Sequence, residues 1–288
     1  MAISISELYI YPVKSLKGIS LNTRRCDIRG LEDDRRWMLI DEHNRFVTQR
    51  QWPALARLHT RLDQDALTLS AGAAEIRIAR SEPDSPIEPA TIWSDQVQVK
   101  AETQPVTAFI QDLLPDLPAL RLVRLAAQRP QAKPQYQGEN THTVFADMAP
   151  LLVANSASLD ALNRALIEKG LAPVPMNRFR PNVVISGIKA FAEHRLQGLQ
   201  HNHYALKFSY PCERCVMTTV DQETGIKHPD MEPYRTLASI NAMPAYGEGE
   251  HHKPANPKAP AFGENALLHA PANATLSVGD SLCAWKNT

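Results

Sequence analysis

Short runs of strand-forming residues, each stopped by proline, glycine or a polar turn, recur through both halves of this chain. The run 3–10 partly alternates polar and apolar side chains, and Pro12 ends it because proline cannot donate a ladder hydrogen bond. The runs 67–69 and 74–78 alternate around a turn at 70–72. No regular succession of strand, helix and strand is present, which argues against a doubly wound sheet. The sequence predicts a mainly β protein with some α-helix, built from two barrel-like or sandwich units.

Turns and irregular segments divide these runs. The segment 36–48 has the pattern of a β-hairpin around a polar turn. The composition of 80–89 predicts a loop, and a second irregular stretch at 129–138 contains two prolines. We expect a domain boundary between residues 114 and 138. A third, proline-rich surface loop is predicted at 243–260, where the pair His251-His252 is typical of a solvated loop.

Two segments have helical spacing of apolar residues. In 106–113 the apolar side chains fall on one face. A second helix is predicted to begin with Ser158 as its cap and to end before Gly170. Strands are expected again at 183–185 and 204–208.

Charge and cysteine content exclude several classes of protein. With 288 residues, 43% of them hydrophobic, the chain has enough apolar material for one large or two medium domains. Its formal net charge of zero gives no long-range field for nucleic acid or an anionic membrane. We find no apolar run near the roughly 20 residues of a membrane helix and no signal peptide pattern. Four cysteines are too few for a disulfide scaffold, so we expect a reducing, cytoplasmic compartment.

The pair Cys212-Glu213-Arg214-Cys215 is the most informative chemical feature of the chain. A guanidinium beside a thiol favours the thiolate, which attacks electrophiles and binds soft metals. The β-branched run at 216–220 predicts a strand after the pair, which disfavours a thioredoxin-type helix start. A zinc site completed by His201 and His203 stays possible, as does a packing role for both thiols.

A further alternative is one thiolate that holds a softer metal or a carried sulfur, next to an anion-binding pocket. Cations that could line such a pocket are spread over the whole sequence, and each alone is more often a solvated surface charge. Arginine and lysine suit phosphate, and a loop serine can add a hydroxyl donor. The candidates are Lys14, Ser15, Arg35, Arg36, Arg178, Arg180 and Arg214. The residues alone do not decide which of them meet.

Five motifs that occur in order give the chain a family resemblance. They are Tyr11-Pro12-Val13-Lys14-Ser15, Asp34-Arg35-Arg36-Trp37, the stretch 179–187 (Phe-Arg-Pro-Asn-Val-Val-Ile-Ser-Gly), Cys215 with Thr218-Thr219-Val220-Asp221, and Phe262-Gly263-Glu264-Asn265. Together they resemble proteins that join a MOSC N-terminal β-barrel domain to a MOSC domain, a family that includes bacterial YcbX-like proteins and the mitochondrial amidoxime-reducing component. The resemblance implies the first domain over 1–120 and the second over 121–288.

The resemblance also implies a molybdenum cofactor, Mo-molybdopterin, bound between the two domains. Cys215 would coordinate the metal and would be catalytic. Asp221 is a second catalytic candidate, for tuning or proton delivery, or else caps the turn 222–225. Pterin and phosphate contacts are implied for Lys14, Ser15, Arg35, Asp147, Arg180 and Glu213. Glu264 stands where glutamine is more familiar in the family, which is expected to alter a hydrogen bond.

The activity implied is the reduction of small N-hydroxylated compounds, namely amidoximes, hydroxylamines and N-hydroxylated bases. Because no further cysteine cluster follows the last strand, electrons are expected from a separate ferredoxin or flavodoxin-like reductase system. Neither nucleic acid nor membrane is an expected partner. The alternative function is a carrier of sulfur or of molybdenum cofactor that does not turn over.

Overall fold

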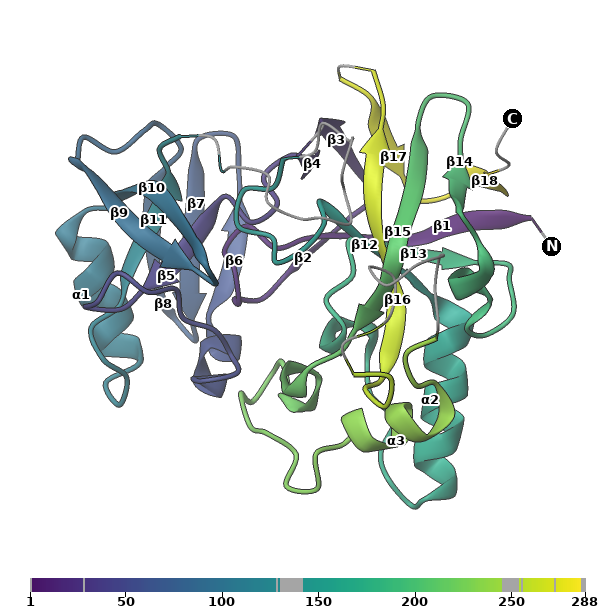
Figure 1. Cartoon of the computed structure of the whole chain (residues 1–288). Helices are drawn as coiled ribbons and strands as arrows, with labels where there is room; N and C mark the ends of the chain where they lie inside the picture. The colour runs from purple at the N-terminus through teal and green to yellow at the C-terminus, as the bar shows by residue number, and fades with distance from the viewer. Residues whose placement is uncertain are drawn as a thin grey trace.

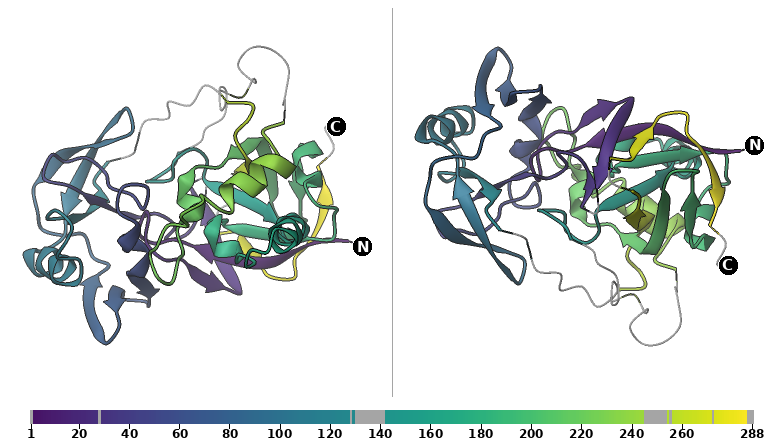
Figure 2. Two further views of the ribbon diagram at one scale, coloured as in Figure 1. Left: turned by 90° about the horizontal axis from the view of Figure 1, so that it is seen from below. Right: turned by 90° about the horizontal axis from the view of Figure 1, so that it is seen from above.

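The computed structural model describes residues 2–27, 29–127, 129, 142–244, 254, 256–271 and 273–285. Most of the predicted irregular stretches 129–138 and 243–260, with His251 and His252, lie outside the described residues. The structure is mainly β, as predicted. Two bodies lie side by side in all three views (Figures 1 and 2). Within the described residues, no helix is long and apolar enough to cross a membrane.

One body is a closed barrel of seven strands. Around the barrel the order is β13 (Val183–Ser186), β12 (Leu151–Asn155), β16 (Ala261–His269), β15 (Ala205–Glu213), β14 (Gly198–Gln200), β18 (Ser281–Ala284) and β1 (Ile3–Ile10), and β1 closes the ring by pairing with β13. The short β2 (Ile19–Leu21) pairs with the C-terminal part of β1. The predicted strands at 3–10, 183–185 and 204–208 are therefore confirmed, and the first strand of the chain completes a barrel built mostly from its second half.

The other body contains a four-stranded and a three-stranded antiparallel sheet. The first has the order β5 (Trp37–Ile40), β11 (Arg121–Leu125), β10 (Asp95–Ala101), β9 (Ile87–Ile92), and the second β6 (His59–Leu62), β7 (Ala66–Ala71), β8 (Ala74–Ala79). Helix α1 (Gln104–Leu113) buries Val106 and Ile110 against them, as the helical spacing predicts. A third small sheet, of β17 (Thr275–Ser277), β3 (Thr23–Asp27) and β4 (Gly30–Leu31), packs against the barrel instead, with Cys26, Leu31 and Leu276 in the barrel core. The 3-10 helix η1 covers Pro53–Arg57.

Two predictions in this body are confirmed only in part. The hairpin predicted at 36–48 forms, but its return segment is no regular strand: it pairs with β5 through one antiparallel bridge, Ile40 with Phe46, and the Val47 N–H donates to the Leu39 carbonyl at 3.0 Å. The predicted loop 80–89 ends early, since Pro89 lies inside β9. That strand is the last of its sheet, and beyond β10 it makes only one bridge, between Thr91 and Arg45; such an edge strand is where a sheet tolerates proline.

Helices cover one end of the barrel (Figure 1). They are α2 (Ser156–Glu168) and α3 (Tyr234–Ile240), with the 3-10 helices η3 (Met176–Arg178), η4 (Ala192–Arg195) and η5 (Val216–Thr219). The predicted second helix exists, but its cap is Asn155, whose side chain accepts a hydrogen bond from the Ala157 N–H at 3.1 Å. Ser158 lies inside the helix and donates to the buried Glu193 at 2.7 Å.

The chain crosses between the two bodies at points that also carry predicted site residues. Ile10 packs in the barrel core, whereas Val13, three residues later, packs in the core of the other body. A second crossing occurs between Phe145 and Leu151, which also belong to different cores. Lys14 follows the first crossing directly, and Asp147 lies within the second, so the fold brings this cation and this carboxylate to the junction.

Candidate functional site

A cavity of about 460 Å³ lies at the junction of the two bodies. Residues from both bodies line it, which is why segments distant in sequence meet there. The sequence-predicted residues on its wall are Lys14, Ser15, Arg35, Asp147, Arg180, Glu213 and Cys215. The cavity wall also contains Arg50, Trp93, Met148, Asn182, Cys212, Arg214, Met217 and Asn265. Asp221 is not among the lining residues.

Three of the predicted cofactor residues hold a strained backbone. The φ angles of Ser15, Arg35 and Arg180 are 65°, 48° and 53°, in the left-handed region that non-glycine residues rarely adopt. Such a conformation costs on the order of 1 to 3 kcal/mol at each residue and concentrates at binding sites. The strain therefore indicates that these three side chains are held in position for binding.

Arg35 and Arg180 both lie over a single buried ring. Their guanidinium carbons lie 4.6 and 4.2 Å from the centre of the Tyr11 ring. Arg35 also donates to Asn182 Oδ1 at 2.9 Å, and Arg180 donates to the Leu16 carbonyl at 2.7 Å. Burial lowers the pKa of Arg180 to about 10, so it stays protonated at neutral pH. The two guanidinium groups are thus fixed cations in the wall of the cavity.

Lys14 and Asp147 form an ion pair at the same wall. The Lys14 ammonium is buried, pairs with Asp147 and donates to the Phe145 carbonyl at 2.8 Å. Burial lowers the pKa of Lys14 to about 8, although Asp147 favours its protonated form. Burial would raise the pKa of Asp147, but Lys14 and Arg50 together hold it well below its ordinary value. At neutral pH this pair is charged on both sides.

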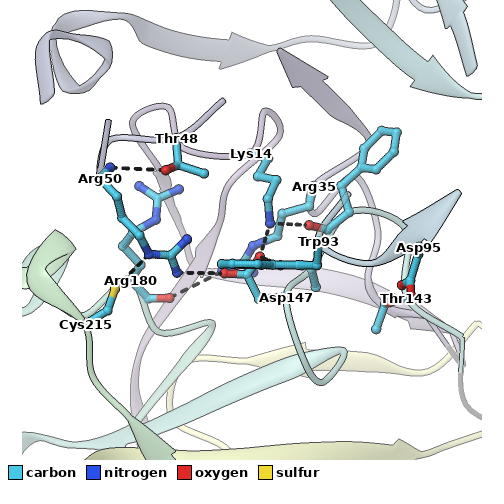
Figure 3. A network of polar contacts seen from close by, with 12 residues as sticks. Lys14, Arg35, Thr48, Arg50, Trp93, Asp95, Thr143, Asp147, Arg180 and Cys215 are labelled. Atoms are coloured by element: carbon cyan, nitrogen blue, oxygen red, sulfur yellow. Dashed lines mark hydrogen bonds and ion pairs between the residues drawn. The ribbon is translucent and has the colours of Figure 1, made fainter. Parts of the chain in front are cut away.

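Arg50 connects this pair to the thiol, and sequence reasoning missed it. Its Nε donates to Cys215 Sγ at 3.1 Å, and its Nη2 donates to Asp147 Oδ2 at 3.3 Å (Figure 3). Burial alone would lower the pKa of Arg50, but Cys215 and Asp147 raise it. No sequence pattern marked it, because the burial of its neighbours Thr48 and Gln49 is a property of the fold.

Trp93 is the second site residue that the sequence did not reveal. It lies in the turn between β9 and β10, and its Nε1 donates to Asp147 Oδ1 at 3.1 Å. The Arg50 guanidinium carbon lies 4.8 Å from the centre of the indole ring (Figure 3). Arg50 therefore has the indole and the Cys215 sulfur as neighbours, and Asp147 accepts from both Arg50 and Trp93.

The two cysteines of the pair have different surroundings. The predicted strand after Cys215 is wrong, because Cys215 is the residue before η5, a single turn of 3-10 helix. That turn is too short to supply the helix dipole of a thioredoxin-type site. Cys212 accepts a hydrogen bond from Arg214 Nη1 at 2.9 Å, but burial raises its pKa, so it stays a thiol at neutral pH. Among the described residues, no group of three or more His, Cys, Asp or Glu is arranged to hold a metal by itself.

Two other predicted positions have structural contacts away from the cavity. Asp221 Oδ1 accepts from the Thr224 N–H at 2.8 Å and from the Glu223 N–H at 3.0 Å, which is the turn-capping alternative. Its other oxygen accepts from Arg178 at 2.7 Å. Glu264 is buried, hydrogen-bonds to His194, and has its pKa raised well above the usual value by burial. Its neighbour Asn265 lines the cavity.

The donor set of the cavity suits an anionic ligand that brings its own metal. Five cations line it against two carboxylates, namely Lys14, Arg35, Arg50, Arg180 and Arg214 against Asp147 and Glu213. The Nε of Arg214 is buried without a hydrogen-bond partner in the described part of the chain. Guanidinium groups match phosphate oxygens, and Cys215 offers the one sulfur donor that contacts Arg50.

Comparison with known proteins matches both halves of the chain to domain families. The family described as MOSC N-terminal beta barrel domain matches residues 2–116, and the family described as MOSC domain matches residues 140–283. Mitochondrial amidoxime-reducing component 1 of Mus musculus is 30% identical over 287 residues, covering 96% of this chain and 81% of the relative. The Homo sapiens protein of the same name is 30% identical with the same coverage. Mitochondrial amidoxime reducing component 2 of Rattus norvegicus is 32% identical, covering 82% of this chain and 72% of the relative.

Proposed function

The chain belongs to the family of proteins that join a MOSC N-terminal beta barrel domain to a MOSC domain, and we propose that it reduces N-hydroxylated small molecules with a molybdenum cofactor. Relatives at 30% identity that are named for amidoxime reduction suggest a MOSC oxidoreductase. Amidoximes, hydroxylamines and N-hydroxylated bases are the proposed substrates. The observation that carries the proposal is the contact of Arg50 with the Cys215 sulfur at the wall of a cation-lined cavity.

The residues present fit the cofactor that the family suggests. Cys215 would be its protein sulfur ligand, and Lys14, Ser15, Arg35 and Arg180 would hold its phosphate and pterin. Asp147 can accept hydrogen bonds from pterin N–H groups once they approach it. When bound, a molybdenum cofactor supplies a metal that exchanges two electrons and can take oxygen from a substrate.

The reaction sets requirements that the protein has to meet. Reduction of an amidoxime to an amidine breaks the N–O bond, consumes two electrons and two protons, and releases the oxygen as water. The electrons come from a separate redox protein of the ferredoxin or flavodoxin-like type. Lys14, whose pKa is about 8, is mostly protonated at neutral pH and stays paired with Asp147. Arg50 keeps its proton and orients Asp147 and Cys215.

The test is molybdenum content and turnover of the same preparations. Wild type made in a molybdenum-replete host should contain close to one molybdenum per chain and reduce benzamidoxime with an artificial electron donor. Cys215→Ala should lose both the metal and the activity, whereas Cys212→Ala is the matched control in the same segment.

Two outcomes would decide against the reductase. Molybdenum bound by wild type without turnover under any donor would favour a carrier of the cofactor. Stoichiometric zinc, lost equally in Cys212→Ala and Cys215→Ala, would favour a zinc module instead.

A further inference from the structure

Trp93 occupies a position where its residue type is unfavourable. It is the first residue of the two-residue turn, Trp93-Ser94, that joins β9 to β10, and its φ is 55°. Two-residue hairpin turns with positive φ prefer Asn, Asp or Gly, and a bulky residue there is strained. The turn would form more easily without tryptophan, which indicates that the side chain serves another purpose.

The indole is also unusually open for its size. Trp93 is 44% exposed, and the neighbouring cavity residue Met148 is 36% exposed. Tryptophan is normally well buried, since its large apolar surface gains most from leaving water. An exposed indole on the wall of a cavity is therefore available to a ligand.

Three contacts hold the indole in one orientation. Its Nε1 donates to Asp147, the Arg50 guanidinium lies over the ring, and the Phe46 ring lies 4.9 Å away at 55° between planes. Figure 3 shows the indole next to Asp147 and Arg50, with Cys215 on the other side of Arg50. A fixed flat surface loses little entropy when a flat ligand stacks on it. Met148 and Met217 add flexible side chains that adapt to ligands of different outline.

We propose that Trp93 determines substrate specificity by stacking against the flat conjugated part of an N-hydroxylated substrate. This inference rests on the proposed function. Aryl amidoximes and N-hydroxylated heteroaromatic bases then bind more tightly than alkyl amidoximes, which present no flat group to the indole. Stacking on aromatic side chains is tolerant of the exact ring, so the site accepts a class of compounds.

The test measures binding without turnover. Benzamidoxime and acetamidoxime are titrated by calorimetry into oxidised, cofactor-loaded protein with no electron donor. Wild type should bind benzamidoxime at least tenfold more tightly than acetamidoxime. Trp93→Asn should lose most of this preference by weakening benzamidoxime binding about tenfold, with acetamidoxime changed less than twofold. Because Asn suits a left-handed turn, this variant should fold at least as well as wild type.

Two controls separate stacking from other roles. Trp93→Phe keeps a ring but loses the hydrogen bond to Asp147, so it should retain most of the preference. Ile87→Ala removes an exposed apolar side chain of the same hairpin outside the cavity and should leave both affinities unchanged.

The proposal is overturned if Trp93→Asn weakens both ligands equally, if it changes neither, or if wild type shows no preference. A wild type that prefers benzamidoxime through Trp93 but does not reduce it when donor is added contradicts the reductase and leaves the stacking role standing.

Discussion

The cavity has two sides that are built differently. The buried wall consists of Lys14, Ser15, Arg35 and Arg180, whose side chains are almost closed to solvent and are held by ion pairs, carbonyls and the Tyr11 ring. The open rim consists of four partly exposed residues, Arg50, Trp93, Met148 and Cys215, of which Arg50 contacts both Trp93 and Cys215.

This difference indicates that the buried wall and the open rim have different functions. Fixed, desolvated cations on strained backbone form a receptor for a permanent anionic group, because they cannot rearrange and water does not screen them. The partly exposed side chains of the rim lie beside a thiol and can bind a substrate reversibly. We therefore expect changes in the buried wall to act on cofactor retention and stability, and changes in the open rim to act on turnover and substrate choice.

The largest effect is expected for Arg180→Gln in the buried wall. Removing one cation from a buried phosphate contact should weaken cofactor retention by about 3 kcal/mol, or roughly a hundredfold. Molybdenum per chain after dialysis measures the loss. Arg180→Lys keeps the charge but not the paired donors, so it should retain an intermediate amount. Full retention by Arg180→Gln would show that this side of the cavity does not hold the cofactor.

Lys14→Met should change how stability depends on pH. The pKa of Lys14 is about 8 in the folded protein and about 10.4 in an unfolded chain, so between these values the unfolded state binds the extra proton. The free energy of unfolding should then rise with pH by about 3 kcal/mol more in wild type than in Lys14→Met. Below pH 8 the difference in free energy of unfolding between the two proteins should not change with pH.

Urea unfolding of the cofactor-free proteins from pH 7 to pH 10.5 measures this difference. Parallel curves for wild type and Lys14→Met throughout that range would mean that Lys14 is not buried as described.

Arg50→Lys, in the rim, should lower turnover without loss of the metal. A lysine keeps the positive charge but cannot contact Cys215 and Asp147 with a planar fork. Loss of these charged hydrogen bonds, worth about 1.5 to 2 kcal/mol, should lower kcat for benzamidoxime roughly ten- to thirtyfold. Molybdenum content should stay within twofold of wild type. If Arg50→Lys loses the metal as completely as Arg180→Gln does, the rim also holds the cofactor and the proposed division between wall and rim is wrong.

Cys212→Ala should have the smallest effect. Burial keeps this residue a thiol, and its contact is with Arg214, which also donates to the Phe179 carbonyl at 2.7 Å. We expect less than a twofold change in molybdenum content and in kcat. A loss comparable to that of Cys215→Ala would assign both sulfurs to one metal or to a disulfide.

Much of the barrel could be predicted from the sequence because its strands carry local patterns. The alternating run at 3–10 and the apolar run at 183–185 are strands by composition alone. Their pairing across the barrel is a property of the whole fold, so the sequence did not reveal that the first strand closes a ring made by the second half. The return segment 45–48 meets β5 on the edge opposite β11, but only through the Ile40–Phe46 bridge, so it does not extend into a strand.

The site residues also fall into those that the sequence predicts and those that only the fold reveals. Lys14, Arg35, Arg180 and Cys215 stand in motifs that a family resemblance identifies, and the structure brings them to one cavity. Arg50 and Trp93 have no local pattern: the first resembles a solvated arginine, and the second violates the residue preference of its turn. Their role depends on contacts between residues more than 40 positions apart, which only the fold shows.

The division between wall and rim is tested most directly by molybdenum content measured side by side on wild type, Arg180→Gln and Arg50→Lys from the same molybdenum-replete host. We expect close to one molybdenum per chain in wild type and in Arg50→Lys, and almost none in Arg180→Gln after dialysis. Wild type without molybdenum, or Arg180→Gln with as much molybdenum per chain as wild type, would contradict the division between wall and rim.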